Sequence, residues 1–226
     1  MEFDCAIRVN NATEAFDVWY ELLSDQAKNG HIQDSRDGDV VGEIIGATTI
    51  IENPTRGIVQ SDIRKMPMRY ALGELLWYLS GSNKVSDISR YSSVWERLSD
   101  DGEHVNSAYG YRIFNQFGFD QWEHVKDLLR KDPLSRQAVI HIKEPNNQTT
   151  KDLPCTVSLQ FFIRDNRLYL ITYMRSNDLW MGFPYDVFSF TALQVKMAME
   201  LGVEVGEYMH IAGSLHLYKR NWMVND

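Results

Sequence analysis

The sequence predicts one mixed α/β domain of the α+β kind, in which helices cover a mixed β-sheet. Its 226 residues suit one large domain better than two, because about 150 residues is usual for a domain. Hydrophobic residues make up 44% and charged residues 24% of the chain, which is typical of a globular protein with a real core. No repeat, low-complexity stretch or linker divides residues 1–226. The expected helices and strands alternate too irregularly for a doubly wound fold.

The net charge and the uncharged segments limit the classes of partner. A net charge of −8 argues against non-specific binding to nucleic acid and to anionic membranes. The longest segments without a charged residue, 153–163 and 208–218, are far shorter than the roughly 20 residues of a transmembrane helix. The N-terminal stretch MEFDCAIRVNN lacks the pattern of a secretory signal. We therefore expect a cytoplasmic protein that binds any phosphate through local cations.

The cysteines and histidines predict neither a structural disulfide nor a metal site. Cys5 and Cys155 lie far apart in a chain without a visible secretory signal, and structural disulfides are rare in that context. The six histidines form no H-x-H or H-E-x-x-H pair, which argues against a metal. At least one free thiol follows.

Residues 11–29 are expected to form the first helix. Asn11 or Thr13 can cap its N-terminus, and Gly30 can end it. Apolar residues recur at helical spacing: Ala15, Phe16, Trp19, Leu22 and Leu23.

A polar segment and a strand follow the first helix. Residues 31–43 are rich in turn-forming residues and predict a loop that carries Arg36. The β-branched run of residues 44–51 predicts a strand.

The next helix is expected between Pro67 and Gly81, which suit its first turn and its end. Its apolar face is expected to consist of Leu72, Leu75, Leu76 and Leu79. Glu74 lies inside this apolar helix with Tyr78 one turn later, so we expect its carboxylate to be partly buried.

Residues 105–118 are aromatic and are expected to form a loop. A D-x-x-E pattern beginning at Asp120 predicts the start of a helix that Pro133 ends. Arg136 then lies at the mouth of a short strand over residues 137–142.

Two β runs, residues 155–163 and 168–174, predict a hairpin. A turn centred on Asp165 and Asn166 makes paired residue numbers sum to 331, which places Cys155 and Arg175 at the same end. Strict alternation puts their side chains on opposite faces, so contact between them requires a β-bulge or the twist of a strand end.

The chain then predicts one more helix and one more strand. The helix runs over residues 187–201 and stops at Gly202. The strand covers about residues 210–218.

Cys155 is the first candidate for chemistry. It follows a proline at the mouth of a strand, with Arg175 close in the hairpin. A cation near a thiol favours the thiolate and makes it a better nucleophile. The alternative is a small buried hydrophobic residue at the start of a strand.

Three segments identify a family. They are MRSNDLWMGFPYD (residues 174–186), PCTVSLQF (154–161) and GSLHLY (213–218). Together they resemble the thymidylate synthase and pyrimidine nucleotide hydroxymethylase family, and the resemblance extends from about Ala15 to Tyr218. Further matching pieces surround Arg36, Glu74, Trp95, Tyr109 and Arg136.

The resemblance implies a single thymidylate synthase-like catalytic domain that forms a homodimer through its sheet. The nucleophile would be Cys155, which adds to carbon 6 of a pyrimidine nucleoside monophosphate. Glu74 would organise proton transfers and water. Arg36, Arg175 and Ser176 match positions that bind the phosphate, and Arg136 matches one that reaches the phosphate from the partner subunit. The family usually has a second arginine after that position, where this chain has Gln137.

The resemblance also implies residues for the sugar and for the cofactor 5,10-methylenetetrahydrofolate. His216 and Tyr218 match residues that hold the sugar hydroxyl, and Tyr109 lines the substrate cavity. Asp178 and Gly182 match positions near the pterin of the folate, and Trp95 lines the same cavity. Each of these residues also has a plain structural interpretation, at the surface for the arginines and Glu74 and in the core for His216, Tyr218 and the aromatic residues.

Asp186 is the most informative departure from the synthases, which have asparagine there. A carboxylic acid can donate to ring nitrogen 3 of cytosine, accept from its 4-amino group and protonate the ring. Aspartate at this position resembles the cytidylate hydroxymethylases. The alternative is a helix N-cap before residue 187.

Two further departures point the same way. Ser214 replaces the aspartate of the synthases in the last motif, and only KRNWMVND follows Tyr218, whereas synthases close the site with a longer segment. An open site favours hydration of a methylene intermediate. The leading hypothesis is therefore a (deoxy)cytidylate 5-hydroxymethyltransferase. The alternatives are a thymidylate synthase and a non-catalytic nucleotide-binding relative.

Overall fold

A mixed sheet with helices packed on it forms the centre of the molecule. The computed structural model describes residues 5–28, 32–34, 39–145 and 149–222. Within them, the strands are β1 (Ala6–Val9), β2 (Ile32–Asp34), β3 (Val40–Ile51), β4 (Val139–His141), β5 (Thr156–Arg164), β6 (Arg167–Met174), β7 (Asn177–Asp178) and β8 (Glu204–Tyr218). The helices are α1 (Ala12–Lys28), α2 (Met68–Ser80), α3 (Val85–Ile88), α4 (Val94–Leu98), α5 (Tyr109–Phe114), α6 (Gln121–Lys131), α7 (Phe183–Leu201) and α8 (Lys219–Trp222), with a 3-10 turn at Pro54–Arg56.

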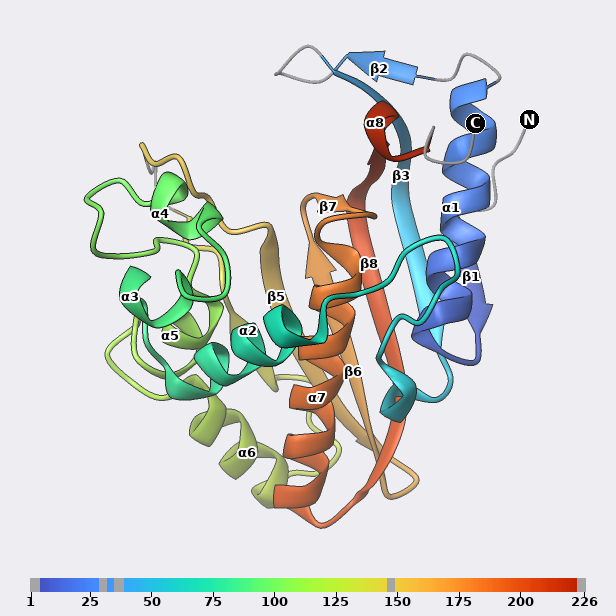
Figure 1. Cartoon of the computed structure of the whole chain (residues 1–226). Coiled ribbons are helices and arrows are strands. Elements are labelled where there is room, and N and C mark those ends of the chain that lie inside the picture. The colour runs from blue at the N-terminus through green and yellow to red at the C-terminus, as the bar shows by residue number, and fades with distance from the viewer. Residues whose placement is uncertain (1–4, 29–31, 35–38, 146–148, 223–226) are drawn as a thin grey trace.

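The sheet confirms the predicted mixed α/β class. Its main path runs β1-β3-β8-β6-β5-β4, while β2 pairs with β3 and β7 pairs with β8. β6 and β7 run parallel to β8 and β1 parallel to β3, whereas the other pairs are antiparallel. Figure 1 shows α1 along β3 and α7 across β6 and β8, and these helices cover the sheet. In the described part of the chain, no helix is sufficiently long and apolar to cross a membrane.

The first helix begins where its cap predicts. Asn11 Oδ1 accepts the backbone N–H groups of Thr13 and Glu14 at 3.0 and 3.1 Å, so Asn11 and not Thr13 caps α1. Gly30 and Arg36 lie outside the described residues.

The loop predicted over residues 31–43 is only partly a loop. β2 pairs antiparallel with the start of β3, which begins at Val40. Polar and turn-forming residues are tolerated there because pairing to a neighbouring strand satisfies the backbone regardless of side-chain type. β8 likewise begins at Glu204, six residues before the predicted strand.

The leucine face predicted for α2 is wrong. Leu72, Leu76 and Leu79 are 48%, 61% and 40% exposed. The buried face consists instead of Ala71, Gly73, Glu74, Trp77 and Tyr78. Periodicity identifies an apolar side of a helix but does not show which side neighbouring elements cover. In α2, they cover the side that carries the Glu74 carboxylate.

The predicted loop over residues 105–118 contains the short helix α5. Gly110 allows it to lie against α2, because a Cβ atom there would come within 2.0 Å of the Tyr78 carbonyl oxygen. A close approach between two backbones, rather than helix propensity, places this segment. By contrast, α6 begins as predicted, with the Asp120 side chain accepting the Glu123 N–H at 3.0 Å.

The β5–β6 hairpin has the predicted register. Paired residues sum to 331 from Arg164 and Arg167 up to Ser158 and Tyr173. Asp165 and Asn166 both have positive φ, as a two-residue hairpin turn requires. A register shift between Thr156 and Ser158 is the bulge needed to bring Cys155 and Arg175 together.

The sheet face opposite α1 and α7 carries apolar side chains. A hollow of about 480 Å³ on this open face is lined by Ile50, Phe162, Arg164, Tyr169, Leu170, Ile171, Glu207 and Met209. Ile45 and Tyr173 on the same sheet are 68% and 42% exposed. Contiguous apolar surface of this kind marks interaction sites.

Candidate active site

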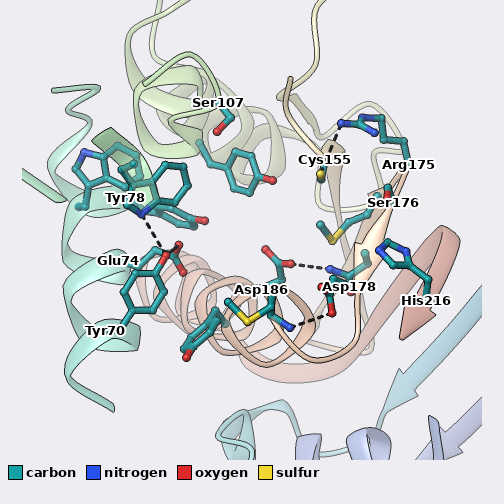
Figure 2. Close-up of a pocket in the computed structure, with 18 of the residues that line it drawn as sticks. Tyr70, Glu74, Tyr78, Ser107, Cys155, Arg175, Ser176, Asp178, Asp186 and His216 are labelled. Carbon is teal, nitrogen blue, oxygen red and sulfur yellow. Dashed lines mark hydrogen bonds between the residues drawn. The ribbon is translucent and has the colours of Figure 1, made fainter. Parts of the chain in front are cut away.

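Most of the predicted site residues line one cavity of about 370 Å³. Figure 2 shows α2 on one side of it and the β5–β6 end, β7 and β8 on the other. The predicted residues that line it are Glu74, Trp95, Tyr109, Cys155, Arg175, Ser176, Asp178, Gly182, Asp186, His216 and Tyr218. Arg136 is exposed and lies outside this cavity.

Cys155 and Arg175 meet at the bulged end of the hairpin. The Arg175 guanidinium donates to the carbonyl oxygens of Pro154 and Leu153, both at 3.0 Å, and its Nη2 lies 3.7 Å from the Cys155 Sγ. The two backbone acceptors hold the cation beside the sulfur (Figure 2). This arrangement stabilises a thiolate electrostatically.

Glu74 points from α2 into the cavity and is only 5% exposed, so its interpretation as a surface residue is wrong. The Tyr70 hydroxyl donates to its Oε1 at 2.7 Å, and the Trp95 indole N–H donates to that hydroxyl at 3.2 Å. Burial raises the pKa of Glu74 to about 7, against the opposing effect of the Tyr70 hydrogen bond. A carboxyl group with such a pKa can both take up and release a proton near neutral pH.

Asp186 is not the cap of α7. The helix begins at Phe183 with Gly182 as its N-cap, so Asp186 lies within the first turn. Its Oδ2 accepts a hydrogen bond from Asn177 Nδ2 at 2.8 Å. Burial, followed by the nearby Glu74 carboxylate, raises the pKa of Asp186 well above its usual value. Its environment therefore favours the neutral acid, and the side chain faces the cavity (Figure 2).

The end of β8 supplies His216 and Tyr218 to the same wall. Their two-residue spacing places both side chains on one face of the strand, and their rings lie 5.4 Å apart. The Ser214 hydroxyl lies 3.5 Å from His216 Nδ1. The structure thus brings together the pair that the last motif predicted.

The β7–α7 turn presents Asp178. Its Oδ1 accepts the backbone N–H groups of Trp180 and Met181 at 2.7 and 3.0 Å, which fixes the carboxylate at the cavity wall. On the opposite side, the rings of Trp77 and Trp95 lie 5.2 Å apart. The cavity therefore combines an acidic acceptor with an aromatic wall.

Sequence reasoning missed several lining residues: Tyr70, Trp77, Ser107, Met174, Asn177, Met181 and Tyr185. A signal existed for Tyr70, because Tyr70, Glu74 and Tyr78 are spaced four residues apart and so share a helix face. Asn177 stands inside the strongest motif, but one of its hydrogen-bond partners, His210, comes from β8. Among the described residues, no cluster of three or more histidine, cysteine or acidic side chains could hold a metal ion.

Comparison with known proteins agrees with this geometry. The model of a family described as thymidylate synthase matches residues 17–224. The chain is also 34% identical over 216 residues to a deoxyuridylate hydroxymethyltransferase of Bacillus phage SP01. That alignment covers 89% of this chain and 56% of the phage protein, so the chain spans about half the length of this curated relative.

Replacing Glu74 by glutamine should change how stability depends on pH. The pKa of Glu74 is about 7 in the fold and 4.5 ordinarily, so its contribution is fully present below pH 4.5 and is lost as the pH rises through 7. Between these values, the wild type should lose up to about 3 kcal/mol more unfolding free energy than Glu74→Gln. Urea unfolding of both proteins across this range measures the difference. Parallel stability profiles would contradict the assignment.

Proposed function

The chain belongs to the thymidylate synthase family, and on that premise we propose that it transfers a one-carbon unit to carbon 5 of a pyrimidine nucleoside monophosphate. The observation that carries the proposal is the meeting of a thiol, a guanidinium and two buried carboxyl groups in one cavity. Its volume of about 370 Å³ is in the range of small-molecule sites.

Cys155 is the proposed nucleophile. Its sulfur forms a bond to carbon 6 of the base, and the electron pair displaced from the 5,6 double bond makes carbon 5 nucleophilic. Arg175 stabilises the thiolate before attack. Together with Ser176 it also lies where a phosphate can be bound, since guanidinium forms paired hydrogen bonds with phosphate oxygens. His216 and Tyr218 hold the sugar.

The cavity fits a reduced folate as one-carbon donor. 5,10-Methylenetetrahydrofolate, when bound, supplies a carbon at the oxidation level of formaldehyde. The Asp178 carboxylate, fixed by two backbone N–H groups, suits the N–H donors of a pterin, and Trp95 offers an aromatic face. Gly182 allows this turn to pack closely, because a Cβ atom there would lie 3.2 Å from the Asp178 carbonyl oxygen and from Asp186 Oδ2.

Hydroxymethylation is the proposed outcome. It requires the one-carbon carrier to leave and water to add to the transferred carbon. Glu74 faces the cavity and can accept a proton from that water, because its pKa is about 7. Loss of the carbon 5 proton and departure of the Cys155 sulfur from carbon 6 then restore the 5,6 double bond. The name of the phage relative, a hydroxymethyltransferase, supports this outcome. A thymidylate synthase activity on deoxyuridylate is the second candidate, which the name of the matching family favours.

Cytidylate is the proposed substrate, in its deoxy or ribo form. Burial raises the pKa of Asp186 well above its usual value, which favours the neutral acid, and in that form the group can protonate ring nitrogen 3 of cytosine as the thiolate adds. The name of the phage relative favours deoxyuridylate instead. Mass spectrometry of products formed from methylenetetrahydrofolate and each of four pyrimidine monophosphates distinguishes these substrates and both reactions.

A homodimer is proposed for the complete site. The open face offers apolar surface to a second copy. Gln160 lies on this face of β5, and its amide donates to the Arg136 carbonyl oxygen at 2.9 Å. This contact beside the open face supports the proposal that Arg136, which lies outside its own cavity, reaches the phosphate bound by the neighbouring subunit.

Cys155→Ser should abolish turnover while nucleotide binding remains. A serine hydroxyl does not supply a stable anion for attack on carbon 6. Product formation and calorimetric binding of the nucleotide measure the two properties. Retention of more than about a tenth of the activity would remove Cys155 from the nucleophile role, and binding without wild-type turnover would favour a non-catalytic relative.

Asp186→Asn should shift the ratio of kcat/KM values from cytidylate toward uridylate. An amide cannot deliver the proton that the cytosine ring needs, whereas uracil already carries a proton on nitrogen 3. The ratio should change roughly ten- to hundredfold in a competition assay. Asp178→Asn is the matched control, because it alters another cavity carboxylate and should leave the ratio unchanged. An unchanged ratio in Asp186→Asn would disprove the role in base selection.

Arg136→Ala and Cys155→Ser subunits should complement each other when mixed. Each variant alone is expected to be nearly inactive. Random exchange makes half of the dimers hybrids with one intact site of two, so about a quarter of wild-type activity should return. Activity before and after mixing, together with light scattering, measures this. An active monomer, or no recovery in confirmed hybrids, would exclude a shared site.

A further inference from the structure

A buried chain of hydrogen bonds leads from the core to Asp186. Tyr208 and His210 belong to β8, and the Tyr208 hydroxyl lies 2.8 Å from His210 Nδ1. His210 Nε2 lies 3.0 Å from Asn177 Oδ1, and Asn177 Nδ2 donates to Asp186 Oδ2 at 2.8 Å. All four residues are buried. Only Asn177 and Asp186 line the cavity.

We call this chain of hydrogen bonds, from Tyr208 through His210 and Asn177 to Asp186, the relay. The direction of each bond in it determines the direction of the next. An amide oxygen only accepts and an amide nitrogen only donates, so His210 must donate through Nε2–H. Burial lowers the pKa of His210 to about 3, which keeps the imidazole neutral. Its Nδ1 is then an acceptor and receives the Tyr208 hydroxyl proton. If donor and acceptor were exchanged in one of these hydrogen bonds, they would have to be exchanged in all the others.

The relay also decides which oxygen of Asp186 carries the proton. Oδ2 accepts from Asn177, so the acid proton belongs on Oδ1. Without such a neighbour, the two oxygens of a carboxylic acid are equivalent. The acid could then offer donor and acceptor in either order by moving its proton.

The order of donor and acceptor on Asp186 matters because cytosine and uracil differ only at nitrogen 3 and at the group on carbon 4. Cytosine presents an acceptor at nitrogen 3 and a donor at the 4-amino group, whereas uracil presents the reverse. An acid or amide that is free to rearrange can match both. We propose that Asn177, held by His210, is the positioning residue that fixes the order in which Asp186 presents donor and acceptor, and thereby selects the base. This inference rests on the proposed nucleotide function.

The surroundings hold the relay in place. The ring of Phe183 meets the His210 ring edge-on at 5.3 Å. At Gly182, a Cβ atom would lie 3.0 Å from Asn177 Nδ2 and 3.2 Å from Asp186 Oδ2, so glycine permits the close approach. Loss of an internal link would leave buried polar groups unpaired, which costs more than a surface hydrogen bond.

Three variants test the relay. Asn177→Asp places an acceptor opposite Asp186 Oδ2, so the proton moves to Oδ2 and is donated to residue 177. Oδ1 then becomes an acceptor, which matches the N–H at nitrogen 3 of uracil and not the acceptor of cytosine. His210→Phe removes the donor that orients the amide and should relax the selection. Tyr208→Phe is the smallest change and should relax it partially. Gln194→Leu is the control, because Gln194 is a buried amide of α7 that donates only to backbone carbonyl oxygens.

The measurement is calorimetric binding of deoxycytidylate and deoxyuridylate, with every variant made in the Cys155→Ser background. We expect the ratio of the two dissociation constants to shift about tenfold or more in Asn177→Asp. It should move toward one in His210→Phe and stay unchanged in Gln194→Leu. A purely structural role would weaken both nucleotides equally, because they share the phosphate and sugar contacts.

An unchanged ratio in the folded relay variants would overturn the inference, and so would binding of neither nucleotide. If Asn177→Asp does not fold, the ratios measured for His210→Phe and Tyr208→Phe test the inference. Product analysis of the wild type tests the proposed function separately. A wild type that binds both nucleotides without transferring carbon would disprove that function, while the ratios would still report on the relay.

Discussion

The pairing of β8 on both of its sides is the interaction on which the rest of the structure depends. This strand of fifteen residues runs antiparallel to β3 and parallel to β6 and β7. It therefore joins the N-terminal half of the sheet to the hairpin that carries Cys155. The same strand supplies His216 and Tyr218 to the cavity wall and His210 to the hydrogen bond with Asn177. A register slip of one residue would exchange the two faces and dismantle core and site together.

The cavity is built around two carboxyl groups that burial keeps from ionising readily. Glu74 and Asp186 come from α2 and α7. Burial raises the pKa of both groups, and the Glu74 carboxylate further raises the pKa of Asp186. Burying such groups opposes folding unless they are neutral or hydrogen-bonded. Tyr70 and Asn177 supply those bonds. The same groups that weaken the fold at high pH place proton donors and acceptors in the cavity that Cys155 lines.

The two faces of the sheet differ in what they contact. The covered face, with α1 and α7, forms the main core and positions the cavity, whereas the open face presents an apolar hollow. Arg136 stands at the edge of that open face through its contact with Gln160. This placement supports the proposal that Arg136 serves the cavity of a second copy of the chain.

Features that depend only on neighbouring residues were predictable from the sequence. The cap at Asn11, the helix start at Asp120 and the hairpin register about Asp165 and Asn166 follow from local hydrogen bonding and turn chemistry. The cavity residues around Cys155 followed from the family motifs. Which face of α2 is buried became clear only from the fold, because sequence periodicity does not show which face of a helix other elements cover. The fold alone joined Asn177 to His210, since strand pairing brings together residues 33 positions apart.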